Sequence, residues 1–268
     1  MAHGILESRE HGNMELEDVG ELYFKELWDR SFFQNVIDFG LFYRFDMHDL
    51  IKDLVQSVAQ GESLMVDSAD TNGVSENVRH LTILRSGQNV STTLQKLNKV
   101  RTIIVYENID VSFLSTCISR FKYLRVLDFS YLSWELVPSS IGSLKHLRIL
   151  NLAGNERITA LPNSICKLQS LQALFLGDCV NFEELPRDVI KLISLRRLDL
   201  TTKQSSFPEN GVGCLKSLRS LTIYGCSNLT CLPRDTSYLA SLCTLMIINC
   251  KQLDLVMENY QVIPNAMQ

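Results

Sequence analysis

The chain has 268 residues, of which 46% are hydrophobic and 21% are charged. This length fits one or two domains, and the composition is that of a folded chain rather than a disordered one. No stretch has the features of a signal peptide or a membrane-spanning helix, and the eight cysteines contain no Cys-x-x-Cys pair. These features predict a cytosolic or nuclear protein with reduced cysteines and no membrane partner.

The charge is unevenly distributed and suggests a division into residues 1–77 and 78–268. The first part has 16 acidic and 5 basic side chains (−11), and the second has 14 acidic and 21 basic (+7). The two parts are therefore electrostatically complementary. A first part this acidic is not expected to bind nucleic acid.

The first part predicts a helix, a hairpin and a second helix. Residues 17–30 have helical spacing of apolar side chains, and residues 36–45, with Gly40 at the centre, predict a short β-hairpin. Asp46 is expected to cap the second helix and Gly61 to lie just beyond its end. The second helix has an apolar stripe: Leu50, Ile51, Leu54, Val55 and Val58. This order resembles a winged-helix unit.

The second part is organised by the repeated pattern L-x-x-L-x-L. The six clear copies are separated by 23, 24, 24, 23 and 24 residues, and two weaker copies precede them. Their first residues are Val78, Val100, Leu124, Leu147, Leu171, Leu195, Leu218 and Leu242. This regularity predicts an α/β solenoid, a leucine-rich repeat horseshoe of about eight turns.

Each position of the repeat has a physical function. Positions four and six fill the core, and positions three, five and seven face solvent. Position nine needs a small polar or thiol side chain that bonds to backbone groups: Asn108, Asn155, Cys179, Cys226 and Cys250. The cysteines are therefore expected to be structural. Segments such as 161–165 and 185–189 contain a proline that ends the strand, and the Ile or Val that follows closes the convex side.

The last repeat is followed only by a short tail that contains Pro264. Terminal turns of a solenoid need a polar cap, and this tail is too short for another turn and a cap. We therefore expect the chain to be truncated at its C-terminus.

Two sets of side chains are candidates for protein binding. Phe175, Arg197, Tyr224 and Met246 occupy solvent-facing positions and are of the types that dominate binding energy at interfaces. Position two carries a row of arginines interrupted by Gln172 and Cys243: Arg79, Arg101, Arg125, Arg148, Arg196 and Arg219. This row is either a solvated rim, with stems packed on neighbouring turns, or a dock for an acidic surface. Arg125, Arg148 and Arg219 represent the row among the candidate binding residues.

Three motifs in the first part of the chain resemble a known protein family. EDVGELYF at residues 17–24, SFFQ at 31–34 and FDMHDLIKDL at 45–54 are similar to plant intracellular immune receptors. These are the nucleotide-binding, leucine-rich-repeat disease-resistance proteins, here of the coiled-coil subgroup. The resemblance covers nearly the whole chain, and Met47-His48-Asp49 matches the family's Met-His-Asp motif.

The resemblance implies a nucleotide-sensing role for His48, with Met47 and Asp49 beside it. In the family this histidine lies near the β-phosphate of ADP and helps to hold the inactive state. An imidazole suits that function because it can donate a hydrogen bond to phosphate and titrates near neutrality. Sequence position alone would make His48 an ordinary residue of the first helical turn.

One part of the family pattern is missing. The chain has no G-x-x-x-x-G-K-[ST] phosphate loop, and residues 211–213 are only a distant approach to one. Met1 lies inside the winged-helix segment, which implies that the nucleotide-binding domain is absent. No cofactor is expected for this chain by itself, whereas a full-length receptor would bind ADP or ATP.

No catalytic or metal motif is present. The five histidines form no H-E-x-x-H pattern, and no G-x-S-x-G sequence occurs. We therefore expect no enzyme activity and no metal.

Two functions remain at this stage. The first is an immune-receptor fragment whose repeats bind a pathogen effector or a guarded host protein. In this view the basic solenoid also folds back on the acidic nucleotide-binding half of the same receptor and keeps it inactive. The alternative is a stand-alone cytosolic leucine-rich repeat scaffold, similar to the Ras-group repeat proteins, that joins signalling partners without nucleotide. The winged-helix motifs favour the receptor.

Overall fold

The structure is a computed structural model with two compact units, residues 1–63 and 64–268, which are described separately. The described residues are 2–3, 15–38, 43–59, 61–67, 75–85, 94–107, 111–207, 211–232 and 241–253. The first unit contains α1 (Leu16–Asp29), β1 (Phe33–Asp38), β2 (Tyr43–Met47) and α2 (Asp49–Val58). The predicted order of helix, hairpin and helix is confirmed.

Aromatic packing joins α1 to the antiparallel hairpin of β1 and β2. The ring of Phe24 lies 4.5 Å from that of Tyr43 and 5.1 Å from that of Phe33, between centroids. Phe33 in turn lies 4.3 Å from Phe45. Such ring pairs contribute about 0.5–1.5 kcal/mol each beyond the area they bury. Because these rings pack, the hairpin begins at Phe33, earlier than expected, while the turn around Gly40 lies outside the described residues.

The cap of α2 differs from the expectation. Asp46 was expected to cap this helix, but it lies within β2, because β2 stays paired with β1 as far as Met47. The oxygen of Asp46 instead accepts a hydrogen bond of 2.9 Å from the amide of Asn35 across the hairpin. His48 is the N-cap, and its Nδ1 accepts a hydrogen bond from the backbone N–H of Leu50. Gly61 follows the helix with φ of +78°, as its expected place beyond the helix end requires.

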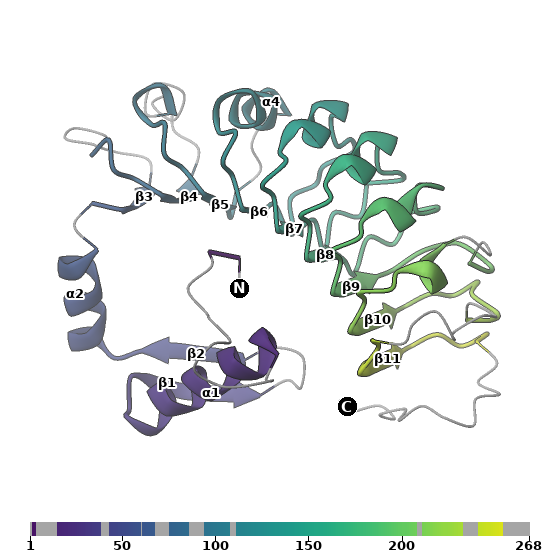
Figure 1. Cartoon of the computed structure of the whole chain (residues 1–268), viewed down its shortest axis with the longest axis horizontal. Coiled ribbons are helices and arrows are strands. Elements are labelled where there is room, and N and C mark those ends of the chain that lie inside the picture. Colours follow the sequence, from purple (N-terminus) through teal and green to yellow (C-terminus); the bar gives the residue numbers. More distant parts are fainter. Residues whose placement is uncertain are drawn as a thin grey trace. The chain divides into compact units, whose positions relative to one another are not determined.

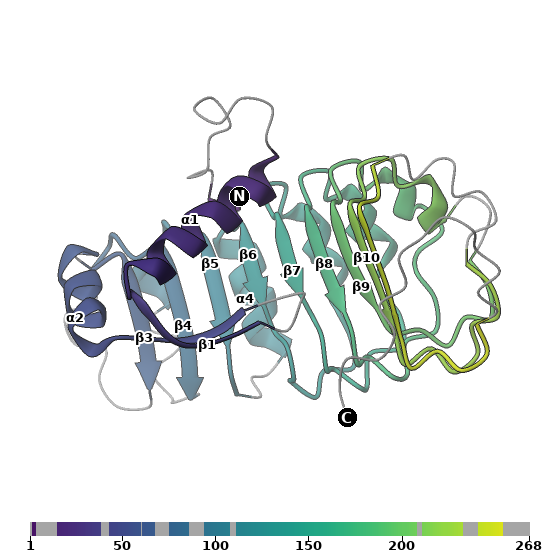
Figure 2. The same ribbon diagram turned by 90° about the horizontal axis from the view of Figure 1, so that it is seen from below.

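The second unit is a solenoid built on a nine-stranded sheet in which β3 to β11 follow one another in chain order. Strands β4 to β11 run parallel. Within this unit the strands line the inner side of an arc, while helices lie on its outer side (Figures 1 and 2). The strands are β3 (Ser63–Asp67), β4 (His80–Arg85), β5 (Thr102–Val105), β6 (Val126–Asp128), β7 (Ile149–Asn151), β8 (Ala173–Leu176), β9 (Arg197–Leu200), β10 (Ser220–Tyr224) and β11 (Thr244–Ile248). The leucine-rich repeat horseshoe is therefore confirmed.

The sheet contains one strand more than the repeat pattern predicts. Strands β4 to β11 correspond to the eight predicted copies, and β3 adds a ninth neighbour beside β4. Residues 63–67 lack the L-x-x-L spacing, but Val66 is only 8% exposed and joins the solenoid core. This pairing is the reason that the division between units falls after Ser63 instead of at the expected residues 77 and 78.

The core is a column of side chains from position four of each repeat. These residues lie opposite one another in the register of the sheet, as Leu127, Leu150 and Leu174 show. None of the eight is more than 8% exposed: Leu81, Ile103, Leu127, Leu150, Leu174, Leu198, Leu221 and Leu245. Full burial of one such side chain stabilises a fold by about 1.5–3 kcal/mol. The column therefore supplies a large share of the stabilisation.

Helices lie on the convex side. Those whose bounds the described residues give are the α-helix α4 (Val111–Arg120) and the 3₁₀ helices η2 (Ser139–Ser143), η3 (Asn163–Lys167), η4 (Val189–Lys191) and η5 (Val212–Cys214). Pro138 and Pro162 precede η2 and η3 in extended conformation, as expected for residues that end the strand run. Ile141, Ile165 and Val189 belong to these helices and are buried. Burial of Ile165 and Val189 confirms their predicted place on the convex side of the core.

Position nine holds the turns together through polar contacts. The Asn155 side chain is fully buried, donates hydrogen bonds of 2.7 and 2.8 Å to the carbonyls of Phe129 and Leu152, and accepts one from the N–H of Trp134. The thiol of Cys179 donates to the carbonyl of Leu152 at 3.2 Å. Burial raises the pKa of Cys179 to about 11, so this thiol stays protonated at neutral pH.

The same position continues to the end of the described solenoid. The thiols of Cys226 and Cys250 lie near the carbonyls of Leu200 and Ile223, respectively. The structural role predicted for these cysteines is confirmed, while Asn108 lies outside the described residues.

Two of the six clear repeats depart from this pattern, and the one that begins at Leu124 has the buried Leu132 at position nine. The repeat that begins at Leu195 has Lys203 at position nine, and two threonines supply the missing contacts. The hydroxyl of Thr201 donates to the carbonyl of Tyr224 at 2.7 Å, and that of Thr202 donates to the carbonyl of Glu183 at 2.8 Å. Both threonines are buried as a result.

Replacement of Asn155 by alanine is predicted to destabilise the solenoid. The substitution removes three side-chain hydrogen bonds and leaves the Phe129 carbonyl without the donor that Asn155 supplies, at a cost of about 1–3 kcal/mol for a buried group left unsatisfied. Asn155→Cys should lose less, because cysteine fills this position in three other repeats. Urea unfolding of the purified chain measures the differences, with the exposed Asn181→Ala as control. Equal midpoints for Asn155→Ala and the control would contradict this account.

Candidate functional site

His48 lies at the junction between the hairpin and α2. Its Nδ1 is 3.2 Å from the backbone nitrogen of Leu50, from which it accepts a hydrogen bond. In the neutral imidazole this contact assigns the proton to Nε2, which can donate to an external acceptor. Met47 ends β2 and Asp49 begins α2, so the three residues of the motif lie together and are exposed.

This junction has the features of one side of a phosphate site. It combines an exposed imidazole donor with the N-terminus of a ten-residue helix, which favours negative charge. The described residues around it include no glycine-rich loop with a lysine, which an enclosed nucleotide site would need. Among the described residues the junction therefore supplies a hydrogen-bond donor and a helix N-terminus without an enclosing loop.

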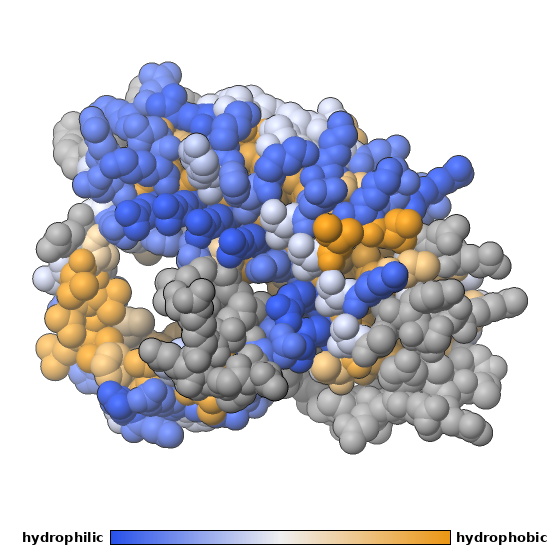
Figure 3. Space-filling view, viewed as in Figure 1, coloured by the Kyte–Doolittle hydropathy of each residue, from blue (hydrophilic) through white to orange (hydrophobic). Residues whose placement is uncertain are grey.

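The apolar face of α2 is open to solvent. Leu50 and Val58 are 72% and 69% exposed, and Leu54 and Val55 are also exposed. Figure 3 shows the hydrophobic side chains gathered over this helix. An apolar face of this kind usually marks a contact with another protein surface. The stripe that the sequence predicts is therefore present, and four of its five residues are exposed.

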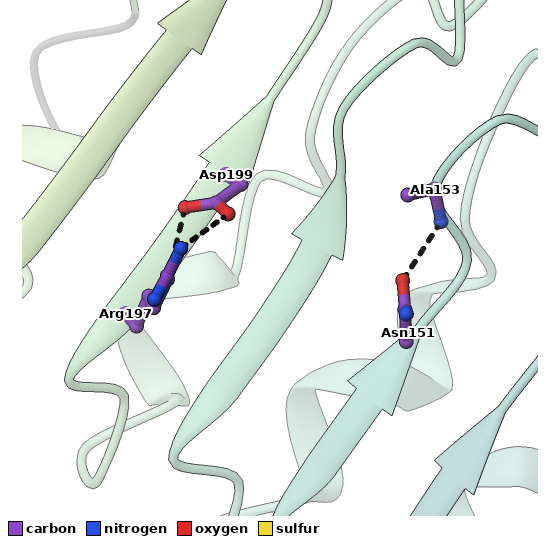
Figure 4. A network of polar contacts seen from close by, with 4 residues as sticks. All are labelled: Asn151, Ala153, Arg197 and Asp199. Carbon is purple, nitrogen blue, oxygen red and sulfur yellow. Dashed lines mark hydrogen bonds and ion pairs between the residues drawn. The ribbon is translucent and has the colours of Figure 1, made fainter. Parts of the chain in front are cut away.

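On the concave face, Phe175, Arg197 and Asp199 form one cluster. The guanidinium of Arg197 donates hydrogen bonds of 3.3 and 3.1 Å to the two carboxylate oxygens of Asp199 (Figure 4). The Cζ atom of Arg197 lies 5.1 Å from the centre of the Phe175 ring. The two ionic side chains are only 28% and 16% exposed, so their charges are neutralised largely within the protein. The structure thus brings together two of the residues predicted to bind protein.

A second polar cluster on this face joins β6 to β7. One oxygen of Asp128 accepts hydrogen bonds from the N–H and hydroxyl of Ser130, and the other accepts one of 3.0 Å from the amide of Asn151. The side-chain oxygen of Asn151 in turn accepts from the N–H of Ala153 (Figure 4). The carboxylate of Asp128 is therefore satisfied by neighbours in its own turn and the next.

Two predicted candidates lie farther along the sheet. Tyr224 ends β10 and is 36% exposed, while Met246 lies on β11 and is partly buried. Two residues at predicted solvent-facing positions, Thr201 and Thr222, are instead buried, and Thr201 is buried because its hydroxyl bonds to the neighbouring turns. Thr222 lies between two strands. Its short side chain is paired with the longer Asp199 and Met246 on the neighbouring strands.

The predicted row of arginines lies where the chain enters the strands. Backbone hydrogen bonds of 2.8 Å join Arg101 to Arg79, Arg125 to Arg101 and Arg148 to Arg125, so the row follows the sheet from turn to turn. All six side chains are partly buried, including that of Arg219. Figure 3 shows a hydrophilic band along the inner edge of the arc over β4 to β6. The arginines form a row separate from the cluster around Phe175.

The sequence analysis missed position eight of the repeat. This position has positive φ in five of the six clear repeats: Tyr131, Gly154, Asp178, Gly225 and Asn249. Glycine, asparagine and aspartate tolerate that conformation, and their recurrence at one position was the available signal. Tyr131 is the unexpected member, because a bulky side chain rarely adopts this conformation.

The described residues contain neither a metal-binding cluster nor a membrane-spanning helix. No group of three or more His, Cys, Asp or Glu side chains there could hold a metal ion. None of the helices in that part of the chain combines the length and apolar character needed to cross a membrane.

Comparison with protein families decides the classification. A model described as a leucine-rich repeat region matches residues 99–262. The chain belongs to the leucine-rich repeat family. A second model, the winged helix domain of disease resistance proteins, matches residues 1–55 and therefore includes His48. Together the two matches identify the parts of a plant disease resistance protein, as the motif resemblance implied.

The most similar relatives include plant proteins with disease-related names. The chain is 39% identical to RGA1 of Solanum bulbocastanum over 159 residues, 59% of this chain and 14% of that protein. Disease resistance protein RGA2 of the same plant is 39% identical over 147 residues, 54% of this chain and 13% of that protein. The disease susceptibility protein LOV1 of Arabidopsis thaliana is 31% identical over 170 residues, 56% of this chain and 18% of that protein. The matched region thus spans less than a fifth of these relatives.

Solved structures support the fold. An internalin C2 of Listeria monocytogenes has a TM-score of 0.52 at 17% identity, over 76% of this chain and 85% of that chain. The structure of a TLR13–ssRNA13 complex has a TM-score of 0.50 at 23% identity, over 64% of this chain and 25% of that chain. At these identities the likeness extends to the repeat fold alone.

The leucine-rich repeat turn at Gly154 supplies a matched pair of substitutions. A Cβ atom at Gly154, whose φ is +70°, would collide with the Tyr131 ring, whereas a Cβ at Gly177 meets no atom within 4 Å. We predict that Gly154→Ala loses about 1–2 kcal/mol from the left-handed backbone alone. Gly177→Ala should remain within about 0.5 kcal/mol of the parent. Thermal unfolding of both variants tests this, and similar losses in the two would contradict the geometry.

Proposed function

We propose that the leucine-rich repeats of this disease resistance protein bind a protein partner and that the winged-helix unit couples this binding to a nucleotide-dependent defence switch. The observation that carries the proposal is the winged-helix match to disease resistance proteins, with Met47-His48-Asp49 exposed at its hairpin–helix junction, followed in the same chain by the repeats. The proposed site of action is the cytosol. The proposed partner of the repeats is a pathogen effector or a guarded host protein. No catalysis is assigned to this chain.

In the switch, ADP is the proposed ligand of the inactive state. Bound ADP would supply a β-phosphate as acceptor, and the Nε2–H of His48 would donate to it. The Nδ1 contact to Leu50 fixes the direction of the ring, so the donor is already oriented. His48 lies between Met47, the last residue of β2, and Asp49, the first residue of α2, and this sets the position of the imidazole.

The nucleotide-binding half of the receptor is the proposed second partner. The exposed apolar face of α2 adjoins His48 in sequence and would pack against that half. The row of arginines is the proposed contact on the solenoid, because residues 78–268 carry +7 and the first 77 residues carry −11. In this arrangement a ligand of the repeats releases the switch by competing for the basic surface.

The alternative, a stand-alone signalling scaffold, has weaker support. A scaffold needs the repeats but has no use for a winged-helix unit of the disease-resistance type. Its Met-His-Asp motif would also have no ligand.

His48→Asp tests the nucleotide contact in a receptor where this chain is joined to a nucleotide-binding domain. Aspartate still caps the helix by accepting from Leu50, but it cannot donate to a phosphate and repels it. We predict at least about tenfold weaker retention of ADP, the effect of one lost hydrogen bond to a charged group. The measurement is ADP released per mole of acid-precipitated receptor. The control is His146→Asp, in a ring that stacks on Tyr123 in the solenoid. Unchanged ADP content in His48→Asp would exclude the sensor role.

Charge reversal of Arg125, Arg148 and Arg219 to glutamate tests the basic row. The receptor is prepared with a protease site between the two halves, and their co-elution is measured after cleavage. We predict that the triple variant separates at lower salt than the parent, because screened attractions between the halves are lost. The control reverses three exposed lysines outside the row: Lys96, Lys145 and Lys216. Each variant is first compared with the parent by thermal unfolding, since the arginines are partly buried. Co-elution of the folded triple variant as in the control would refute the contact.

A further inference from the structure

Two recesses adjoin where the chain leaves strands β7, β8 and β9 on its way to the convex side. The smaller has a volume of about 340 Å³ and is lined by Glu183, Glu184, Gln204, Ser205 and Ser206. The larger has a volume of about 540 Å³ and lies between the segments that follow β7 and β8. Both volumes are within the range of about 300–1,000 Å³ that is typical of ligand sites. Glu184 lines both recesses, which together we call the exit groove.

Hydrogen bonds hold the walls of the exit groove in place. The N–H of Glu183 donates to the carbonyl of Thr159 in the preceding turn at 2.8 Å. On the other side, the hydroxyl of Thr202 donates to the carbonyl of Glu183 at 2.8 Å and accepts from the N–H of Gln204 at 3.2 Å. The walls are therefore set by the fold before any ligand arrives, which lowers the entropic cost of binding.

Small side chains leave room beside Glu184 in both neighbouring turns. Ala160 pairs with Glu184 in a parallel bridge and contributes only a methyl group to the larger recess. In the following turn, Ser205 and Ser206 line the smaller recess with short hydroxyl side chains. The carbonyl of Ser205 accepts from the N–H of Thr230 at 2.9 Å, which fixes this wall in turn. The exposed Glu184 side chain can therefore be reached from either recess.

The smaller recess offers negative charge and hydrogen-bond acceptors. Within the described residues, the carboxylates of Glu183 and Glu184 make no hydrogen bond and no ion pair. The side-chain oxygen of Gln204 is buried and also has no hydrogen-bond partner. The adjacent basic residue, Lys203, donates to Asn181 at 2.7 Å. A buried acceptor without a donor costs free energy, so a positively charged ligand with several N–H groups is favoured here.

The larger recess adds apolar surface beside this charge. Leu161, Leu185 and Pro186 contribute its apolar lining. Its polar lining includes Arg187, which does not line the smaller recess. A basic group is therefore directed toward the smaller recess, where the glutamates lie, while an apolar group fits the larger one.

We propose that the exit groove binds a short segment of the protein partner, with an arginine side chain in the smaller recess and a neighbouring apolar side chain in the larger one. The proposal rests on the protein-binding function given above and specifies the chemistry of one contact. This contact is separate from the row of arginines, which lies where the chain enters the strands.

Arginine fits the smaller recess better than a lysine, a metal ion or an anion. Its guanidinium has five N–H donors, so it can bond to a carboxylate through two of them and still reach a second acceptor. A lysine has the charge without this fork. No group of three or more His, Cys, Asp or Glu side chains in the described ranges could hold a metal ion, and a metal ion would not use the apolar lining. The two glutamates would repel an acidic or phosphorylated segment.

The proposal is tested on the full 268-residue chain with short peptides. The probe is acetyl-Ala-Leu-Arg-Leu-Ala-amide, which has an apolar residue on either side of the arginine. One analogue has citrulline in place of arginine, and the other has alanine in place of both leucines. Binding is followed by chemical-shift changes in ¹⁵N spectra of the chain.

We expect saturable shifts at the backbone of residues 160, 184 and 205, with a dissociation constant of about 1 mM or lower. The citrulline peptide should bind at least about tenfold more weakly, because it lacks the charge. The alanine analogue should bind at least about threefold more weakly, because it leaves the apolar lining exposed.

Two variants locate the site. Glu183→Gln combined with Glu184→Gln removes both charges at nearly constant size and should weaken binding of the probe at least about tenfold. Ala160→Leu fills the larger recess from an exposed position and should abolish the advantage of the probe over its alanine analogue. The control Glu156→Gln removes an exposed carboxylate that lines neither recess and should bind like the parent. Thermal unfolding establishes that all variants are folded.

Three results would overturn the proposal: no saturable shifts at the exit groove, equal binding of the citrulline peptide, or parent-like binding by the folded double glutamine variant. Calcium chloride is titrated separately, and shifts at the same residues with calcium but not with the probe would also overturn it. None of these results would change ADP retention in the His48→Asp experiment or the salt dependence of co-elution. Failure of the exit groove is therefore distinguishable from failure of the proposed switch.

Discussion

No turn of this solenoid can bury its apolar edge alone, and every other feature of the second unit depends on that constraint. The position-four side chains lie in register from Leu81 to Leu245, so each turn covers the next. This alignment of neighbouring turns also requires hydrogen-bond donors for the backbone carbonyls at the strand ends. Asn155 and the later cysteines supply them, and Thr201 and Thr202 do so where position nine is lysine. The polar contacts therefore preserve the stacking that the leucines drive.

Because register is fixed, residues at equivalent positions form rows across the concave side. Neighbouring strands lie about 4.8 Å apart, so side chains from successive turns are close enough to interact. The row at the strand entrances is arginine-rich, whereas the position-eight row at the strand exits contains Tyr131, Gly154, Asp178, Gly225 and Asn249. The fold determines where these rows lie but not their chemistry. Opposite edges of one sheet can therefore recognise different groups.

The sequence predicts the features that repeat and misses those that depend on single contacts. Eight strands and the position-nine column follow from a period of 22 to 24 residues. Strand β3 lacks the leucine spacing and becomes recognisable only through its pairing with β4. His48, rather than Asp46, caps α2 because the hairpin pairing extends to Met47. The position of the Tyr131 ring over Gly154 depends on one positive φ, which side-chain patterns do not reveal.

The hydroxyl of Thr201 has a mechanical consequence. It accepts a hydrogen bond from the N–H of Asp178 in the preceding turn and donates one to the carbonyl of Tyr224 in the following turn. One side chain therefore joins three successive turns. Loss of this one hydroxyl would therefore break side-chain contacts on both sides of the turn that contains β9.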